Sequence, residues 1–267
     1  MKILVGMSGG VDSAVAAYLM KQAGHEVIGA TMSIWEKGRS FSGISTADAC
    51  FSPHEEQDIA AAQEICSLLN IPYRTVDCSE IYKKTVLANF KNEYMSGRTP
   101  NPCVWCNAKI KFQALPDAAR AAGIDFDKFA TGHYARIFLN TETNRYCLCR
   151  GIDDKKDQSY FLYRLNQEQL AGILLPLGDK TKMEIRDIAR TVGLPVSDKP
   201  ESQDFYSGNI NDILQAEPKP GLFIMKDGTV MGKHNGFWNY TIGQRKGLGI
   251  SAPAPLYVIG FDKRSEE

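Results

Sequence analysis

The chain has 267 residues, and its 43% hydrophobic and 23% charged residues are typical of a folded protein whose core could serve one or two domains. Lysine plus arginine and aspartate plus glutamate both number 31, so the net charge gives no sign of a nucleic-acid-binding protein. No apolar run reaches the roughly 18 residues of a membrane-spanning helix, and Met1 leads directly into a strand without a signal-peptide pattern. We therefore expect a cytoplasmic protein with no membrane partner.

Strand-like and helical patterns alternate along the first half of the chain. The alternation is typical of an α/β protein with a doubly wound parallel sheet, in which ligands bind at the carboxyl ends of the strands. Apolar runs predict strands at 2–7, 27–33, 73–78 and 129–138, and apolar residues at helical spacing predict helices at 14–23, 53–69, 81–94 and 109–122.

The second half of the chain has a different pattern. Period-two alternation predicts a strand at 145–150, and an amphipathic helix is expected within 181–194. From Gly221 onward, short apolar runs are broken by Gly, Asn and Pro, which predicts a small β-rich domain. We expect two domains, residues 1–205 and 206–267.

The stretch Ser8 to Ser13 reads SGGVDS and lies between the first predicted strand and the first predicted helix. Gly9 and Gly10 would let the backbone approach a ligand closely, the two serines supply hydroxyl groups, and the first amides of the helix point toward a bound anion. The loop is not a Walker A motif, because no Gly-Lys-Ser/Thr follows, and it lacks the third glycine of the dinucleotide fingerprint. We interpret it as a phosphate-binding loop.

Basic residues gather between Lys83 and Lys111, where six of them accompany one acid, Glu93. Such a stretch is compatible with a solvated helix face and equally with a contact to a phosphate backbone. The sequence leaves both interpretations open.

The chain has seven cysteines. In a protein that we expect to be cytoplasmic, they favour metal, redox or nucleophilic roles over a disulfide scaffold. Pro102 is suited to the first turn of a helix, which places Cys103 and Cys106 on one face. We expect both thiols to have a lowered pKa, because a helix amino end and the nearby Lys109 and Lys111 favour thiolates. A single CxxC pair is compatible with three interpretations, which are metal ligation, redox chemistry and accidental spacing.

Cys50 precedes Ser52-Pro53-His54-Glu55, which resembles a capping box with proline at the first helical position. Cys50 is therefore expected near a second helix amino end, which would again favour a thiolate. The remaining cysteines are expected to be packing thiols: Cys66, Cys78, Cys147 and Cys149.

Several ordered motifs resemble one enzyme family. SGGVDS resembles the signature of the PP-loop ATP pyrophosphatases, which have the adenine nucleotide alpha hydrolase-like fold and leave AMP on the substrate. Together with the other motifs, it resembles the tRNA-specific 2-thiouridylases (the MnmA family) along essentially the whole chain. These other motifs are 97–107 (GRTPNPCVWCN), 131–136 (TGHYAR), 154–161 (DKKDQSYF), 201–204 (ESQD) and 240–249 (YTIGQRKGLG).

The resemblance implies ATP-dependent adenylation of the C2 oxygen of the wobble uridine in tRNA, followed by displacement of AMP by sulfur. ATP and Mg²⁺ are the implied cofactors. The implied partners are tRNA and a sulfur donor, which could be a cysteine desulfurase, a sulfur relay or inorganic sulfide. The residues implied for ATP are Gly6, Met7, Ser8, Gly9, Gly10, Val11, Asp12, Ser13, Met32 and Gly132, and those implied for the target base and tRNA are Asn101, Pro102, Cys103, His133, Lys156, Asp157 and Gln158.

Two positions depart from the family pattern. Cys103 stands where most members have an acidic residue, and Tyr206 stands where the family has its second catalytic cysteine. The usual scheme forms a persulfide on that second cysteine, and the cysteine matching Cys106 resolves it. Family members also continue into a further β-barrel domain, which this chain lacks.

Several accounts of the sulfur chemistry follow, with Asp12, Cys103 and Cys106 as the catalytic residues. Cys50, Cys103 and Cys106 could bind a [4Fe-4S] cluster with one open iron. Alternatively, Cys103 or Cys50 replaces the missing persulfide carrier. The chain could also be a non-catalytic paralogue that binds tRNA or ATP, or a PP-loop thiolase that acts on another RNA base.

Overall fold

The computed structural model describes residues 1–35, 49–197, 205–206 and 208–262. These residues divide into two compact units. The first unit contains residues 1–35, 49–85, 103–197 and 205–206, and the second contains residues 86–102 and 208–262.

A five-stranded parallel sheet forms the centre of the first unit, which confirms the predicted doubly wound fold. The strand order β3-β2-β1-β4-β7 reverses direction at β1, so the carboxyl ends of β1 and β4 flank a topological switch point. Ligands of open α/β sheets bind in the crevice at such a point. The strands are β1 (Lys2–Gly6), β2 (Glu26–Ser33), β3 (Tyr73–Asp77), β4 (Lys128–Ala130) and β7 (Ile173–Leu174).

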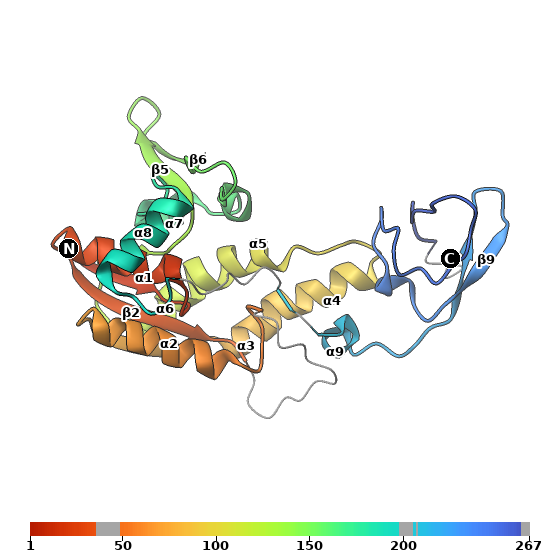
Figure 1. Cartoon of the computed structure of the whole chain (residues 1–267), viewed down its shortest axis with the longest axis horizontal. Helices are drawn as coiled ribbons and strands as arrows, with labels where there is room; N and C mark the ends of the chain where they lie inside the picture. The colour runs from red at the N-terminus through yellow and green to blue at the C-terminus, as the bar shows by residue number, and fades with distance from the viewer. Residues whose placement is uncertain (36–48, 198–204, 207, 263–267) are drawn as a thin grey trace. The chain divides into compact units, whose positions relative to one another are not determined.

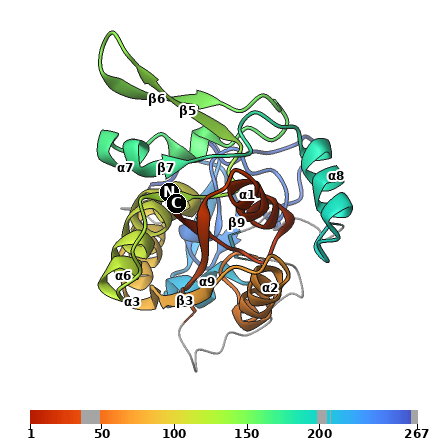
Figure 2. The same cartoon turned by 90° about the vertical axis from the view of Figure 1, so that its left-hand side faces the viewer.

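Helices cover both faces of this sheet. Figure 2 shows α1 (Val11–Gln22), α2 (Glu55–Leu68) and α8 (Lys182–Val192) on one side, and α6 (Leu115–Ala121) and α7 (Gln167–Gly172) on the other. Each buried aliphatic side chain contributes about 1.5–3 kcal/mol by leaving water, so this apolar layer fixes α1 and α8 against the sheet. The layer includes Ile3, Val5, Val15, Ile65, Ile185 and Ala189, all fully buried.

The predicted strand at 129–138 is wrong as a single strand. β4 ends at Ala130, and β5 (Ala135–Asn140) pairs antiparallel with β6 (Arg145–Arg150) in a separate hairpin. Figure 1 and Figure 2 show this hairpin projecting beside α7, to which Tyr146 of β6 is hydrogen-bonded through Gln167. The apolar run is interrupted because Gly132 packs against the backbone of α1, where a Cβ would lie 2.6 Å from the carbonyl carbon of Asp12.

Two of the predicted helices are longer than expected and contain π-helical turns. The first runs through α3 (Ser79–Tyr82), the π-helix η1 (Lys83–Leu87) and α4 (Ala88–Met95). The second runs through α5 (Pro102–Cys106), the π-helix η2 (Asn107–Ala114) and α6, and it begins at Pro102 as predicted. A π-helical turn widens the spacing of side chains, which the 3.6-residue period of the sequence does not reveal.

Helix α8 follows the rules for helix ends closely. The Thr181 hydroxyl accepts from the Glu184 amide while the Glu184 carboxylate accepts from the Thr181 amide, and Gly193 ends the helix with φ of 74°. The predicted amphipathic helix at 181–194 is therefore confirmed.

The second unit contains the predicted small β region. β8 (Gly221–Ile224) and β9 (Val230–His234) form an antiparallel hairpin, accompanied by α4, α9 (Ile210–Leu214) and the 3-10 turn η4 (Phe237–Asn239). Leu214, Phe237 and Trp238 are buried, and the Trp238 indole donates to Asn211 Oδ1 at 3.2 Å. No helix in the described residues is both long and apolar enough to cross a membrane.

The contact between Gly132 and α1 yields a stability prediction. We expect Gly132→Ala to lower the free energy of unfolding by about 1–3 kcal/mol, because the new methyl group would meet the backbone of Asp12 and Ser13. Gly172→Ala is the matched control, since nothing lies within 4 Å of the added methyl group there. Urea unfolding of both variants measures the difference, and equal stabilities would refute the close approach.

Candidate active site

The signature loop is held in shape by its own serines. The Ser8 amide donates to Ser13 Oγ at 3.1 Å, and the Ser13 hydroxyl donates to the Gly10 carbonyl at 3.0 Å. Gly9 has φ of +70°, and a Cβ there would lie 2.7 Å from the carbonyl oxygen of Asp58 in α2. Gly10 is the N-cap of α1, so the first amides of this helix face the space above the loop.

The other residues implied for ATP gather at the same edge of the sheet. Gly6 is the last residue of β1, Met32 lies near the end of β2, and Gly132 is the second residue after β4. The carboxyl ends of parallel strands meet at one edge, so these residues surround the switch point together with the loop. Their contact with ATP stays a prediction.

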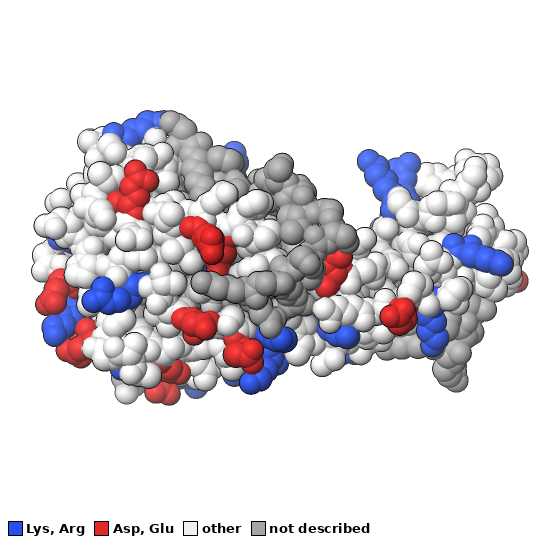
Figure 3. All heavy atoms as spheres, turned by 90° about the horizontal axis from the view of Figure 1, so that it is seen from below, with Lys and Arg blue, Asp and Glu red and all other residues white. Residues whose placement is uncertain are grey.

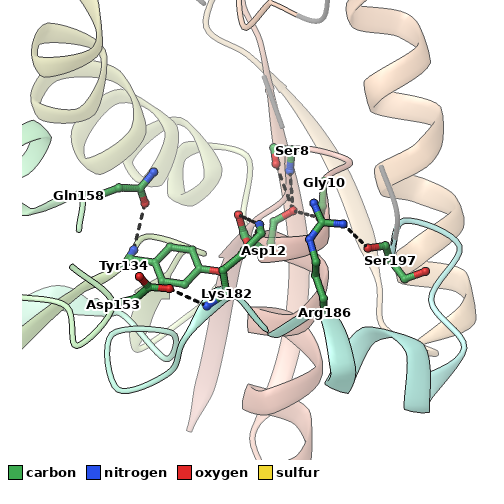
Figure 4. Close-up of polar contacts among 10 residues, drawn as sticks. Ser8, Gly10, Asp12, Tyr134, Asp153, Gln158, Lys182, Arg186 and Ser197 are labelled. Atoms are coloured by element: carbon green, nitrogen blue, oxygen red, sulfur yellow. Dashed lines mark hydrogen bonds and ion pairs between the residues drawn. The ribbon is translucent and has the colours of Figure 1, made fainter. Parts of the chain in front are cut away.

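Asp12 forms the centre of a polar network that the sequence did not reveal (Figure 4). The Lys182 ammonium lies 2.7 and 2.8 Å from the two Asp12 carboxylate oxygens, and the Tyr134 hydroxyl donates to Oδ1 at 2.7 Å. Lys182 comes from α8, 170 residues further along the chain. No motif pointed to it, and its position after the capping residue Thr181 was the sole local signal.

The polar loop before η3 (Ser159–Leu162) connects to this network. Gln158 Oε1 accepts from the Tyr134 amide at 3.0 Å, as Figure 4 shows, and the Gln158 amide donates to the Tyr134 carbonyl at 2.9 Å. Asp157 accepts from the Gly151 amide at 3.0 Å and from the Ser159 hydroxyl at 2.8 Å. These internal bonds fix the loop that carries Lys156, whose predicted contact with tRNA is not tested.

The prediction of low-pKa thiols at the CxxC pair is wrong for the ligand-free chain. Burial raises the pKa of Cys106 to about 12, and it also raises that of Cys103. The Lys111 ammonium lowers both pKa values, as expected, but its effect is smaller than that of burial. Lys109 is exposed and is not among these influences. Both thiols are therefore protonated at neutral pH.

Cys50 lies in the same cluster as the CxxC pair. A charge on Cys50 raises the pKa of Cys103 and of Cys106, which places the three sulfurs within electrostatic range of one another. The Phe51 amide donates to the Phe205 carbonyl at 3.0 Å, and the rings of Phe51 and Tyr206 are 6.2 Å apart. Cys50 is exposed, and its neighbour Phe51 contacts Tyr206, the position where the family pattern has its second catalytic cysteine.

Metal ligation by this cluster is not supported by its geometry. Among the described residues, no group of three or more His, Cys, Asp or Glu side chains is arranged to hold a metal ion. The predicted ligands Cys50, Cys103 and Cys106 therefore do not fit a [4Fe-4S] cluster as they stand, and the cluster stays a prediction.

Two of the expected packing thiols are confirmed as buried. Burial raises the pKa of Cys66 to about 12 and that of Cys78 to about 11. Cys147 and Cys149 are partly buried on β6.

His133 lies beside the cysteine cluster and is neutral. Burial, and then the Lys111 ammonium, lowers the pKa of His133 to about 3. Its Nδ1 is 2.8 Å from the Thr131 hydroxyl, and its ring is 5.5 Å from that of Phe112 in η2. His133 therefore links the end of β4 to the CxxC helix as a neutral hydrogen-bonding group.

The capping box expected at Ser52–Glu55 is wrong. Helix α2 begins at Glu55, and Ser52 Oγ accepts from the His54 amide instead. The Glu55 carboxylate accepts from the Ile34 amide at 2.6 Å and from the Trp35 amide at 3.1 Å. Its negative charge is satisfied by the chain that follows β2, a tertiary contact that competes with local capping.

The CxxC helix carries an unsatisfied polar atom. Asn107 is 3% exposed, and its Oδ1 has no hydrogen-bond partner among the described residues. Such an atom costs about 1–3 kcal/mol unless a ligand or water pairs with it. Asn101 and Pro102, which precede the cysteines, belong to the second unit, and their predicted contact with the target base is not tested.

Exposed aromatic rings cluster on the first unit near the CxxC helix. Tyr160 and Tyr163 are 64% and 62% exposed, and their rings are 6.1 Å apart. The guanidinium of Arg164 lies 4.4 Å above the ring of Trp105, the residue before Cys106. Flat rings and a cation in such an arrangement suit the stacking of unpaired bases.

The basic stretch 83–111 does not form a continuous positive patch. Lys84 pairs with Glu80 at 3.4 Å, Arg98 pairs with Glu93 at 2.6 Å, and Lys111 is partly buried beside the cysteines. Over the part of the chain that the structure describes, Figure 3 shows acidic and basic side chains interspersed on the face in view.

Comparisons with known proteins decide the family. A family model described as "tRNA methyl transferase HUP domain" matches residues 1–206, and one described as "tRNA methyl transferase PRC-barrel domain" matches residues 209–267. A tRNA-specific 2-thiouridylase MnmA of Endomicrobium trichonymphae is 54% identical over 266 residues, which cover 99% of this chain and 74% of that protein. The chain belongs to the MnmA family of tRNA-specific 2-thiouridylases.

Other members of the MnmA family are similar over the same span. The protein of Leptospira interrogans serogroup Icterohaemorrhagiae serovar copenhageni is 47% identical, covering 98% of this chain and 69% of its own.

A solved 4-thiouridine synthetase–RNA complex with bound ATP is 14% identical with a TM-score of 0.45, covering 80% of this chain and 45% of that one. An NMN synthetase from Francisella tularensis is 18% identical with a TM-score of 0.45, covering 79% and 70%.

The raised thiol pKa values give a labelling prediction. At pH 8 we expect iodoacetamide to modify the exposed Cys50 at least about a hundredfold faster than Cys106, because the thiolate is the nucleophile and Cys106 is buried and protonated. Mass spectrometry of quenched samples measures both rates. Comparable labelling of the two cysteines would contradict the burial of Cys106.

The same values predict how stability depends on pH. The folded pKa of Cys106, about 12, lies above the unfolded value of about 8.5. The contribution of the protonated Cys106 thiol to the free energy of unfolding is therefore complete below a pH of about 8.5. It is lost as the pH rises toward the folded pKa. Cys106→Ala should reduce the alkaline decline in unfolding free energy, which urea titrations between those pH values measure.

Proposed function

We propose that the chain is an ATP-dependent tRNA-uridine 2-sulfurtransferase that thiolates the wobble uridine of tRNA. One structural observation supports this proposal most strongly: two groups of residues that a thiolation reaction needs lie at the same edge of the sheet. These groups are the phosphate-type loop after β1 and the cysteine cluster beside the end of β4. The relatives of the chain are 2-thiouridylases. A thiolation reaction needs an activating nucleotide and a sulfur nucleophile at the same base.

ATP would activate the base by adenylation. The C2 oxygen of uridine attacks the α-phosphate, the bond to the β-phosphate breaks, and pyrophosphate leaves. An amide-like oxygen is a poor leaving group, whereas the same oxygen within AMP is a good one. The loop amides and the Ser8 and Ser13 hydroxyls would hold the phosphates. Mg²⁺, which favours carboxylate and phosphate oxygens, would be held by Asp12 and would supply positive charge there.

Cys50 would carry the sulfur as a persulfide. Its exposure makes it accessible to a sulfur donor, and the next residue, Phe51, contacts Tyr206, which stands at the position of the missing family cysteine. The terminal sulfur attacks C2, the bond from C2 to AMP breaks, and AMP leaves with the electron pair. Cys106 then attacks Cys50 Sγ and the S–S bond breaks with its electron pair on the sulfur at C2. The thiol proton of Cys106 passes to the thiolated base anion, so that sulfur remains on C2 and a Cys50–Cys106 disulfide forms. An external dithiol reduces the disulfide, and a sulfane-sulfur donor recharges Cys50.

Two neighbours suit Cys106 to this role. The Lys111 ammonium lowers the pKa of its thiol, although burial keeps that pKa high in the ligand-free chain. Cys103 lies one helical turn away and is less buried. We infer that Cys103 faces the target base and can exchange the disulfide with Cys106.

The predicted [4Fe-4S] cluster on the three cysteines, which their geometry does not support, would give a distinct result. Protein purified without oxygen would contain iron and acid-labile sulfide in stoichiometric amounts, and loss of either Cys50 or Cys106 would remove both. The persulfide account predicts neither iron nor labile sulfide, with a mass increase of one sulfur on Cys50 after treatment with a sulfane-sulfur donor.

The function is tested by product analysis. Purified full chain, tRNA, ATP, a persulfide donor and a dithiol should give 2-thiouridine at the wobble position together with AMP and pyrophosphate. A thiolated base elsewhere would identify a thiolase for another base. Formation of a methylated base, which the family-model description would suggest, or of no product with any tRNA would overturn the proposal.

Cysteine variants separate the two half-reactions. We expect Cys106→Ser to lose at least about a hundredfold of thiolation while tRNA-dependent AMP formation continues, because Cys106 acts after adenylation. Cys147→Ser on β6 is the matched control and should retain both activities. Nucleoside mass spectrometry and AMP chromatography read out the two steps, and equal losses in both would assign Cys106 to folding or to adenylation.

The exposed aromatic rings give a prediction for RNA binding. We expect Tyr160→Ala and Tyr163→Ala each to weaken tRNA binding by about 1–3 kcal/mol through the loss of base stacking, whereas the phenylalanine variants should bind normally. Tyr257→Ala, in the second unit and 54% exposed in the wild-type chain, is the control. Unchanged tRNA dissociation constants in both alanine variants would exclude this surface.

A further inference from the structure

The signature loop lacks a positive charge of its own. Residues Ser8 to Ser13 contribute hydroxyls, amides and the carboxylate of Asp12, but no lysine or arginine. Walker A loops meet a strongly negative triphosphate with a lysine inside the motif. Any protein cation that accompanies Mg²⁺ at this loop must therefore come from elsewhere in the chain.

Lys182 is the cation that lies beside the signature loop. Its ammonium is 2.7 Å from Asp12 Oδ1, and its side chain is 11% exposed. The ring of Tyr134, whose hydroxyl donates to the same carboxylate, lies 5.8 Å from the ammonium. Figure 4 shows Lys182 and Tyr134 meeting at Asp12, on the first turn of α1 above which an anion would bind.

The backbone of Lys182 is fixed independently of its ammonium. Its amide donates to Asp153 Oδ2 at 3.0 Å, and the Thr181–Glu184 capping box holds the start of α8. Further along the helix, Arg186 donates to the Ser197 carbonyl at 2.8 Å. The four-carbon side chain can therefore swing while its base stays in place.

A purely structural role explains this pair poorly. Removing a lysine and a carboxylate from water costs several kcal/mol per ion, and apolar residues often stabilise as well in their place. The Lys182–Asp12 pair lies at the sheet edge that carries the signature loop, and it links α8 to the first turn of α1. A role in ligand binding therefore explains the pair better than a role in stability.

We propose that Lys182 is the phosphate-binding lysine of this site. In the ligand-free chain Asp12 holds the ammonium in place, and on nucleotide binding the ammonium contacts the phosphates beyond the α-phosphate. There it stabilises the negative charge that builds up on the leaving pyrophosphate. This inference rests on the proposed use of ATP.

Binding of ATP and of AMP to variants of the 267-residue chain tests the proposal. Calorimetry should show that Lys182→Met weakens ATP binding by about tenfold to a hundredfold, the effect of one charge-assisted hydrogen bond. AMP binding should change less than about twofold, because AMP lacks the contacted phosphates. Lys180→Met, which removes the same charge two residues earlier, should leave both affinities unchanged.

Two further variants keep the test decisive if Lys182→Met does not fold. Lys182→Gln retains a donor to Asp12 without the charge and should show the same selective loss of ATP affinity, whereas Lys182→Arg should restore most of it. Equal losses for ATP and AMP, or no loss, would overturn the role of Lys182. Failure of the wild-type chain to bind ATP would instead refute the proposed function.

Discussion

The close approach of the β4 loop to the first turn of α1 is the constraint on which the rest of the structure depends. Because Gly132 has no side chain, this loop packs against the backbone of Asp12 and Ser13. That contact brings the ends of β1 and β4 together at the switch point and directs Tyr134 toward Asp12. A larger residue at 132 would separate the phosphate loop from the segment that reaches the cysteine cluster.

Two lysines, Lys182 and Lys111, lie in the two different parts of the candidate site. Lys182 pairs with the carboxylate of Asp12, on the side of the phosphate loop. Lys111 lies among the cysteines, where it lowers the pKa of the CxxC thiols and of His133. Each lysine is screened from solvent, so its charge acts over a longer distance than it would in water. The loop after β4 is in contact with both surroundings, because Tyr134 shares the Asp12 carboxylate with Lys182 and the Lys111 charge acts on His133.

The sequence predicted the features that depend on local order. Strand and helix alternation, the position of the signature loop between β1 and α1, and the ends of α8 all follow from neighbouring residues and were confirmed. It did not predict the contact of Lys182, because a salt bridge across 170 residues leaves no local pattern. The high pKa of Cys106 was missed for a related reason: burial comes from the packing of distant segments and outweighs the neighbouring lysine. The π-helical turns after Cys106 likewise lack a distinct sequence period.

The central claim is that ATP activates the carbonyl oxygen of the base at this sheet edge. The most direct measurement uses tRNA whose wobble uridine carries ¹⁸O at C2, incubated with the protein, ATP, a persulfide donor and a dithiol. Adenylation predicts that the label leaves with the nucleotide, so mass spectrometry of the released AMP should find one ¹⁸O atom in its phosphate for each 2-thiouridine formed. Unlabelled AMP beside thiolated tRNA would contradict the account.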